Sequence, residues 1–461
     1  MATKALSALE FRRLLPANFN GSVPKAIALS GGADSIALAS LLRQELQSIK
    51  HLYAFTVDHG LRAEGSVEAQ FIHEHYSSLG FHHEILGIKA LPRTGIEKNA
   101  RTARYSAITQ ACLKHGITEL YLGHHADDQA ETVLMRMMQG SGWRGLAGMW
   151  PIASNPLSMT MIDAFKVRLF RPLLSIPKVR LLATCRERQL RWHEDSSNHD
   201  TALTPRNAIR YALRTVEDLP EALKPMSLVQ MSLDMQRGLR RENSDVIWVR
   251  KACQASLCRV TGSITFRVSG VAYDKQSSSS VQVSLLEHFS RVISPVAAID
   301  RKALETVQQL LQKYLREPSL PLQCTAAGLL WKFSEGDCQI QRQPFGRAET
   351  PLVNQVENGS LRKHQVQWDR RFWVCYNRPH DQVEIRALRK EDIKTMRTKA
   401  RHLPIRDEME KFLSIAKGQV RFTLPILVDR VSRRMLAIPS AGIKFDTTID
   451  CDCRLVAEHI W

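Results

Sequence analysis

The sequence predicts an α/β protein with a parallel-sheet N-terminal domain, a helical middle region and a smaller α+β domain at the C-terminus. Three observations predict it. Short apolar segments alternate with amphipathic helical segments through residues 25–123, as in βαβ units. Polar motifs containing glycine, aspartate or histidine directly follow three of the apolar segments. At 461 residues the chain is too long for one core, so two or three domains are expected.

The elements of the first half follow from the apolar pattern. Ligands of a parallel sheet bind beyond the carboxyl ends of its strands, so the loops at 30–35, 58–62 and 124–131 are the candidate site. A polar, irregular segment at 192–210 is expected to close this domain. The expected strands are 25–29, 52–57, 82–88 and 119–123, and the expected helices are 35–46, 67–79, 96–115 and 177–190.

The second half has a weaker pattern. Helices are expected at 217–241 and 301–316, a surface loop at 276–280, and a linker rich in proline and glycine at 342–359. Strands are expected at 366–376, 382–387, 419–422 and 434–438.

Composition bounds the class of protein. Sixty-four Lys and Arg against 46 Asp and Glu give a net charge of +18, which favours a polyanionic partner such as a nucleic acid over a merely basic surface. No apolar run is long enough to span a bilayer. Nine cysteines without a Cys-x-x-Cys pair argue against a disulfide scaffold or a zinc ribbon, and favour a reducing compartment.

The N-terminal segment has two interpretations. Residues 1–20 carry Lys4, Arg12 and Arg13 against one acid, Glu10, which is similar to a mitochondrial presequence. An ordinary first helix explains the same pattern, and the sequence does not separate the two.

The loop Ser30-Gly31-Gly32-Ala33-Asp34-Ser35 lies between an expected strand and an expected helix. Consecutive glycines let backbone N–H groups form an anion-binding turn, and the helix N-terminus adds its positive dipole. Ser30 and Ser35 supply hydroxyl donors. A carboxylate beside phosphates needs a cation, so Asp34 predicts Mg²⁺. A tight turn alone would explain the glycines but not Asp34 and both serines.

This loop resembles the signature of the PP-loop ATP-pyrophosphatase superfamily, whose members cleave ATP between the α and β phosphates through an adenylated intermediate. Further motifs resemble the tRNA(Ile)-lysidine synthase family over residues 25–210. Two departures are Ser196, where the family often has proline, and Pro205 before Arg206. The matching strings are VDHGLR (57–62), ARTARY (100–105), GHHADDQAET (123–132), GSG (140–142), GL (145–146), GM (148–149), RPLL (171–174), EDSSN (194–198), Arg206-Asn207 and Arg210.

The resemblance implies a Rossmann-like sheet of the adenine nucleotide alpha hydrolase-like type, and it implies roles for site residues. Asp34, with Mg²⁺ as its metal, Asp128 and Glu131 would be catalytic. Asp128 and Glu131 are three residues apart and share a helix face, where they could bind an ammonium or accept its proton; a simple acidic helix cap is the alternative. Which of the two is the base stays open. ATP would contact Ser30, Gly31, Gly32, Ala33, Asp34, Ser35, Val57 and Asp58, and the substrate or tRNA would contact Arg101, Arg104, His125 and Arg206.

The implied reaction joins L-lysine to C2 of the wobble cytidine of a tRNA(Ile) with a CAU anticodon, releasing AMP and pyrophosphate. A tRNA thiolation enzyme is the main alternative, but such enzymes usually need paired cysteines. A non-catalytic tRNA-binding homologue and a small-molecule amidotransfer synthetase are further alternatives. The enzyme would act in the mitochondrial matrix if eukaryotic and otherwise in the cytoplasm, with no membrane partner and with a homodimer left open.

The domain boundaries are expected as follows. Residues 1–24 form an N-terminal extension that could serve in targeting, and 25–215 form the PP-loop catalytic domain. Residues 216–341 form a mainly helical tRNA-binding region, and 342–461 an α+β domain.

Overall fold

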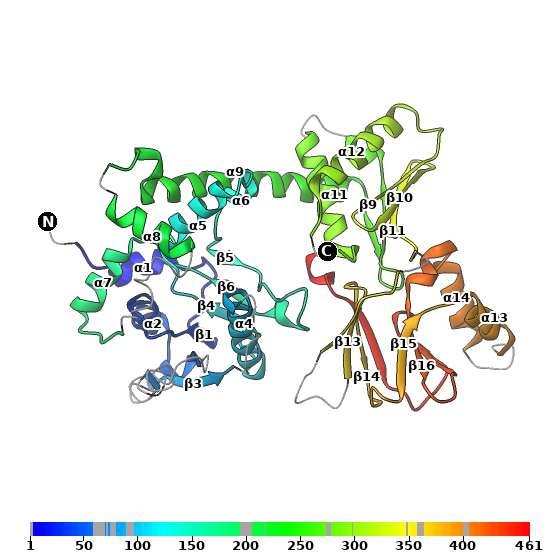
Figure 1. Ribbon diagram of the computed structural model, residues 1–461, viewed down its shortest axis with the longest axis horizontal. Helices are drawn as coiled ribbons and strands as arrows, with labels where there is room; N and C mark the ends of the chain where they lie inside the picture. The colour runs from blue at the N-terminus through cyan, green and yellow to red at the C-terminus, as the bar shows by residue number, and fades with distance from the viewer. Residues whose placement is uncertain are drawn as a thin grey trace. The chain divides into compact units, whose positions relative to one another are not determined.

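A computed structural model describes residues 3–58, 70, 72–73, 80–88, 96–193, 205–216, 218–272, 278–296, 298–346, 349–356, 364–399 and 405–461 (Figure 1). The chain divides into two compact units, Met1–Arg240 and Arg241–Trp461. The expected motifs at 59–62 and 194–198, and most of the expected helix at 67–79, lie outside the described residues.

The first unit contains a six-stranded sheet with the strand order β3-β2-β1-β4-β6-β5. All neighbouring strands are parallel except β5, which runs antiparallel to β6. This confirms the predicted fold class. The strands are β1 (Lys25–Ala28), β2 (Leu52–Asp58), β3 (His82–Gly87), β4 (Glu119–Tyr121), β5 (Ile152–Ala153) and β6 (Arg168–Phe170).

Helices cover both faces of this sheet. Successive side chains of a strand point to opposite faces, so apolar residues on both faces need to be covered. Ile27 packs in a core with α1, α2 and α7, whereas the adjacent Ala26 packs in a second core with Ile108 and Cys112 of α4. The helices of this unit are α1 (Ala8–Leu14), α2 (Ala33–Glu45), α4 (Ile96–Lys114), α5 (Ala126–Met138), α6 (Trp143–Leu146), α7 (Lys178–Glu187) and α8 (Pro205–Thr215). Helix α9 (Pro225–Ala252) contains the boundary between the units.

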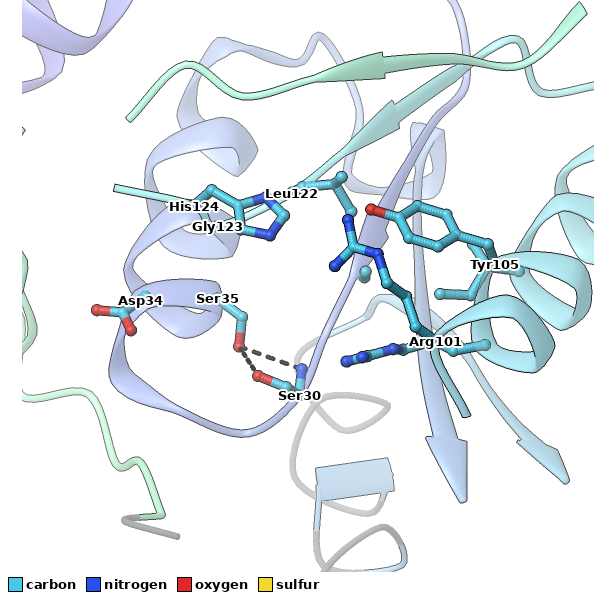
Figure 2. Close-up of a pocket in the computed structure, with 11 residues that line it drawn as sticks. Ser30, Asp34, Ser35, Arg101, Tyr105, Leu122, Gly123 and His124 are labelled. Carbon is cyan, nitrogen blue, oxygen red and sulfur yellow. Dashed lines mark hydrogen bonds between the residues drawn. The ribbon is translucent and has the colours of Figure 1, made fainter. Parts of the chain in front are cut away.

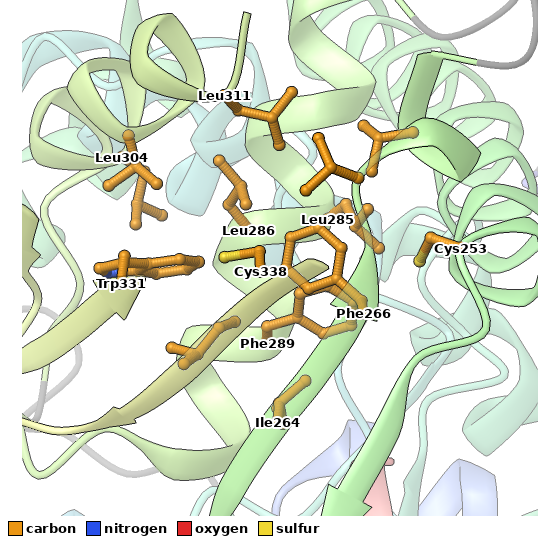
Figure 3. Packing of buried hydrophobic residues seen from close by; sticks show 14 of the residues in the cluster. Cys253, Ile264, Phe266, Leu285, Leu286, Phe289, Leu304, Leu311, Trp331 and Cys338 are labelled. Atoms are coloured by element: carbon orange, nitrogen blue, oxygen red, sulfur yellow. The ribbon is translucent and has the colours of Figure 1, made fainter. Parts of the chain in front are cut away.

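The described residues of the second unit form three antiparallel sheets. The first, with the order β7-β8-β11-β10-β9, packs against α11 and α12, and the core includes Trp331, Phe289 and Leu304 (Figure 3). The other two have the orders β12-β13-β14-β19 and β15-β16-β17-β18. The helices are α10 (Ser269–Ala272), α11 (Ser279–Ile293), α12 (Arg301–Arg316), α13 (Lys390–Lys399) and α14 (Arg406–Ile415). The strands are β7 (Ser256–Cys258), β8 (Ser263–Arg267), β9 (Leu322–Ala326), β10 (Leu329–Ser334), β11 (Asp337–Arg342), β12 (Val353–Val356), β13 (His364–Trp368), β14 (Phe372–Tyr376), β15 (Val383–Ala387), β16 (Pro425–Asp429), β17 (Met435–Ile438), β18 (Ile443–Lys444) and β19 (Cys451–Leu455).

Several local expectations were wrong. The segment 366–376 is not one strand but most of the antiparallel pair β13 and β14, and the expected linker at 342–359 contains β12. The segment 419–422 is not a strand but part of the 3₁₀ helix Gly418–Thr423, where Thr423 donates its hydroxyl to the carbonyl of Val420 at 2.8 Å. Residues 205–210 are not irregular but open α8; a proline at the first helical position needs no hydrogen-bonded N–H. In addition, the sheet β7–β11 includes strands within 216–341 that the sequence did not indicate.

None of the helices in the described ranges combines the length and apolar character that a bilayer span requires.

Candidate active site

The candidate site lies beyond the carboxyl ends of β1 and β4, which are neighbours in the sheet. Strand β1 has β2 as its neighbour on one side and β4 on the other, so the strand order reverses direction at β1. Such a topological switch point is where ligands of open parallel sheets bind. Gly123 follows β4 and touches the loop after β1. A Cβ on Gly123 would lie 3.0 Å from the backbone nitrogen of Ser35 and 3.1 Å from the carbonyl carbon of Asp34.

The glycine loop is held by its own serines. Ser35 Oγ accepts from the N–H of Ser30 at 3.2 Å and donates to the carbonyl of Gly32 at 3.0 Å. The hydroxyl oxygens of Ser30 and Ser35 lie 3.2 Å apart. Gly31 has a φ of +82°, which favours glycine. Helix α2 begins directly after Gly32, so its N-terminal N–H groups point toward the mouth of the loop.

Two carboxylates meet at His125. Its Nε2 lies 3.4 Å from Asp34 Oδ2 and 3.4 Å from Asp128 Oδ2, and its backbone N–H donates to Asp128 Oδ2 at 3.1 Å. Burial favours the neutral forms, but His125 and the nearby cations outweigh it and hold the pKa of Asp34 and of Asp128 below their ordinary value. In turn, burial lowers the pKa of His125, but the two carboxylates more than offset this and leave it raised. Both carboxylates are therefore ionised at neutral pH.

Glu131 lies one helical turn beyond Asp128, on the same face of α5 as predicted. It is buried, with 2% of its surface exposed. Arg206 Nε donates to Glu131 Oε2 at 2.7 Å, and Arg210 Nε donates to Glu131 Oε1 at 2.7 Å. Arg206 also reaches Asp128 Oδ1 at 3.2 Å. Both oxygens of Glu131 are thus occupied by guanidinium groups.

A cavity of about 190 Å³ opens beside the loop, and Figure 2 shows Ser30 and Ser35 between Asp34 on one side and Arg101 and Tyr105 on the other. Whole-ligand pockets usually span about 300–1,000 Å³, so this one suits a single ring or a phosphate group. Its lining residues are Ala28, Ser30, Asp34, Ser35, Arg101, Arg104, Tyr105, Ile108, Leu122, Gly123 and His124.

The cavity is rich in cations. Burial lowers the pKa of Arg104, which lines the cavity, and of Arg171, which interacts with the lining residue Tyr105. The Nε of Arg171 is buried without a hydrogen-bond partner among the described residues. His124 stays neutral, because burial lowers its pKa to about 4. An anionic ligand would compensate these charges.

A further cation reaches the site from α7. Lys178 Nζ lies 3.4 Å from Asp34 Oδ2, and the backbone N–H of Lys178 donates to Asp127 Oδ1 at 3.1 Å. The sequence did not associate Lys178 with Asp34, because no spacing rule joins positions 144 residues apart. The preceding Pro177 indicated that a helix begins at this point, but the sequence did not indicate which residues that helix end would contact.

The predicted site residues divide into groups. One cavity is lined by Ser30, Asp34, Ser35, Arg101 and Arg104. A chain of ion pairs that begins at Asp34 connects this cavity to His125, Asp128, Arg206 and Glu131. The loop contains Gly31 and Gly32, and Ala33 is the first residue of α2. Val57 packs against the core on the α4 side, and Asp58 ends β2; neither lines the cavity.

No group of three or more His, Cys, Asp or Glu side chains arranged to hold a metal ion occurs among the described residues. Asp34 still offers one ligand, because its Oδ1 is buried and has no hydrogen-bond partner within the described chain. A single carboxylate fits a cation that is held mainly by phosphate oxygens.

Comparison with known proteins gives the following matches. The family model described as a PP-loop domain matches residues 9–217. A probable tRNA(Ile)-lysidine synthase of Schizosaccharomyces pombe is 29% identical over 453 residues, covering 93% of each chain. A tRNA(Ile)-lysidine synthase of Orientia tsutsugamushi is 26% identical over 452 residues, covering 94% of this chain and 92% of that one.

Other bacterial relatives match more closely over a shorter length. A tRNA(Ile)-lysidine synthase of Bradyrhizobium diazoefficiens is 38% identical over 203 residues, covering 43% of this chain and 54% of that one. The chain thus spans about half the length of that relative. Among solved structures, a U34-tRNA thiolase from Methanococcus maripaludis has a TM-score of 0.40 at 19% identity, covering 50% of this chain and 78% of that chain.

Proposed function

We propose that this chain is a tRNA(Ile)-lysidine synthase that uses ATP to join L-lysine to C2 of the wobble cytidine of a CAU-anticodon isoleucine tRNA. The observation that carries the proposal is the convergence of a phosphate-binding loop, an ionised pair of carboxylates and an arginine-lined cavity at one switch point. Each of these three parts serves one substrate: ATP, the lysine ammonium and the RNA base.

The reaction has two steps. The C2 oxygen of cytidine attacks the α-phosphorus of ATP, a P–O bond forms, and pyrophosphate leaves as the α–β bond breaks. The lysine ε-amine then attacks C2, so a C–N bond forms, the C2–O bond breaks and AMP leaves. The attacking nitrogen must first lose the proton that makes it an ammonium.

The loop Ser30–Ser35 binds the pyrophosphate end of ATP through its backbone N–H groups and the N-terminus of α2. Asp34 would hold Mg²⁺ through its Oδ1, which has no hydrogen-bond partner within the described chain. When bound, the ion offsets the negative charge of the phosphates. His125 fixes the orientation of the Asp34 carboxylate from the other side. Val57 and Asp58, at the end of β2, border the adenosine.

Asp128 binds the lysine ammonium and accepts its proton, whereas Glu131 holds Arg206 and Arg210 in place. We assign the roles in this way because both oxygens of Glu131 already accept hydrogen bonds from guanidinium groups at 2.7 Å. Asp128 is ionised and lies beside Asp34, where the activated base would form.

Arg101, Arg104 and Tyr105 receive the cytidine in the cavity beside the loop. The base must leave its stack, at a cost of a few kcal/mol. An anticodon loop is single-stranded, so this cost is lower than in a duplex. The net charge of +18 attracts the RNA backbone, and we assign residues 216–341 to binding the rest of the tRNA.

The compartment follows from the substrate. In a eukaryote the substrate would be a mitochondrial tRNA and the enzyme would act in the matrix; in a bacterium it would act in the cytoplasm. A homodimer is one oligomeric state to be tested by light scattering.

The test is incubation of the purified protein with ATP, Mg²⁺, radiolabelled lysine and unmodified tRNA with a CAU anticodon. We expect lysine stably incorporated into the RNA, lost on Asp34→Ala and kept on Asp407→Ala, an exposed residue of α14. AMP formation without lysine transfer would point to another acceptor, as in a thiolation enzyme. No ATP turnover at all would indicate a non-catalytic tRNA-binding homologue.

A further inference from the structure

Lys178 contacts one carboxylate through its main chain, that of Asp127, and another through its side chain, that of Asp34. Its N–H donates to Asp127 Oδ1 at 3.1 Å, and its Nζ lies 3.4 Å from Asp34 Oδ2. Helix α7, which begins at Lys178, is itself held against the glycine loop, because Cys185 Sγ donates to the carbonyl of Ala33 at 3.4 Å. The backbone N–H of Ala126 also donates to the carbonyl of Ile176 at 3.0 Å. These contacts hold the start of α7 beside the glycine loop, and so they position the Lys178 ammonium near it.

The position of Lys178 differs from that of the other cations of the cluster. His125 contacts Asp128 as well as Asp34, and Arg206 contacts Glu131 as well as Asp128. Asp34 is the one ion-pair partner of Lys178 within the described residues, and the 3.4 Å contact is long for a charged hydrogen bond. An ammonium has three donors, so at least two remain for a ligand. The side chain is 32% exposed and so can reach one.

The charge balance of the site points to the ligand. Asp34 lies at the mouth of the phosphate-binding loop, and its Oδ2 is neutralised by Lys178 and His125. A divalent cation bound together with the phosphates would neutralise Asp34 in place of Lys178. The Lys178 ammonium would then be available to the phosphate oxygens.

We propose that Lys178 is a second phosphate-binding residue: it pairs with Asp34 in the substrate-free protein and with the pyrophosphate part of ATP when nucleotide binds. The inference rests on the ATP use in the proposed function and adds a residue that binds the leaving pyrophosphate.

The test compares two nucleotides that differ only in the group Lys178 would contact. Binding of a non-hydrolysable ATP analogue and of AMP is measured by calorimetry, with Mg²⁺ and without tRNA or lysine, for wild type, Lys178→Met, Lys178→Gln and Lys178→Arg. We expect Lys178→Met and Lys178→Gln to weaken the ATP analogue by about 10-fold to 100-fold, since each charged hydrogen bond contributes about that much. AMP affinity should change less than about twofold, and Lys178→Arg should restore part of the loss.

The matched control is Arg186→Met, which removes an exposed cation from the same helix and should change neither affinity. Thermal unfolding of each variant checks that α7 stays folded, with Lys178→Gln as the milder change. Equal weakening of ATP analogue and AMP would overturn the inference, because it would indicate a general distortion of the site. An unchanged affinity for the ATP analogue would also overturn it.

The two proposals fail separately. If wild type binds the ATP analogue but makes no lysidine, the proposed function falls, and the contrast between ATP analogue and AMP still decides the role of Lys178. If lysidine forms but the contrast is absent, only the role of Lys178 falls.

Discussion

Gly123 is the point of closest approach between the two loops of the site. Because a Cβ there would meet backbone atoms of Asp34 and Ser35 at 3.0–3.1 Å, Gly123→Ala must push the loops apart by a few tenths of an ångström. We expect lysine incorporation to fall by about tenfold or more, since small misplacements of reacting groups are costly. Stability should fall by less than about 2 kcal/mol. The lysine-incorporation assay and thermal unfolding measure the two effects.

Gly87→Ala is the control for this change. Gly87 ends β3, has no positive φ, and a Cβ there would meet nothing within 4 Å. Equal activity of the two alanine variants would mean that the close approach at Gly123 is unnecessary.

A substitution of Glu131 tests the proposal that Asp128 is the base and that Glu131 only holds the two arginines in place. Glu131→Gln keeps the shape but leaves Arg206 and Arg210 without their charged partner. We expect a loss of about 3 kcal/mol of unfolding free energy, as for other buried pairs that lose one member. Denaturant unfolding measures it, with the exposed Glu187→Gln on α7 as control. A variant as stable as wild type but unable to transfer lysine would instead make Glu131 the base.

Local motifs allowed much of the site to be predicted from the sequence. Asp128 and Glu131 share a helix face as their spacing predicts, and Asp34 follows from the loop motif. The partners of Glu131 were not predictable from spacing, because Arg206 and Arg210 lie 75 and 79 residues away. The contact between Lys178 and Asp34 depends in the same way on the packing of α7 against α2.

Helix α1 is part of the first unit, although its sequence also resembles a targeting segment. Ser7 and Glu10 form a capping box, Arg180 donates to Glu10 at 3.0 Å, and Phe11 is fully buried in the core with α2 and α7. Phe11→Ala should therefore cost about 3–5 kcal/mol. Leu9→Ala, on the same helix but 65% exposed, should cost little. Equal denaturation midpoints for both variants would show that α1 adds nothing to the stability of the unit.

The elements of the first unit were predictable because each βαβ step has a local apolar pattern; the expected strand at 25–29, for example, is β1 (Lys25–Ala28). The second unit was harder because its sheets join short antiparallel strands. The segment 419–422 shows why. Val420 alternates with Phe422 as in a strand, yet the carbonyl of Thr423 accepts from Trp368 Nε1 and Arg371. Tertiary hydrogen bonds therefore favour the turn over the strand.

At the scale of the whole molecule, one buried and two partly buried histidines predict the pH dependence of stability. Burial lowers the pKa of His83 and His124 in the first unit, and of His288 in the second, to about 4. The unfolded chain binds these protons near pH 6.5, so between about pH 6.5 and 4 it holds more protons than the folded chain. Stability must therefore fall on acidification in this window, by up to about 1.4 kcal/mol per pH unit for each histidine.

The other titrating groups of the site act outside this window. Asp34 and Asp128 have pKa values lowered from 3.8, so their contribution is fully present above pH 4 and is lost only below it. His125 has a raised pKa, so its contribution is present below about pH 6.5 and is lost as pH rises above that value. Together these signs predict a stability maximum near neutrality. Melting temperatures from pH 4.5 to 8.5 measure it, and His288→Gln should flatten the acid side for the second unit alone. A melting temperature independent of pH from 6.5 to 4.5 would show that these histidines are protonated in the folded protein.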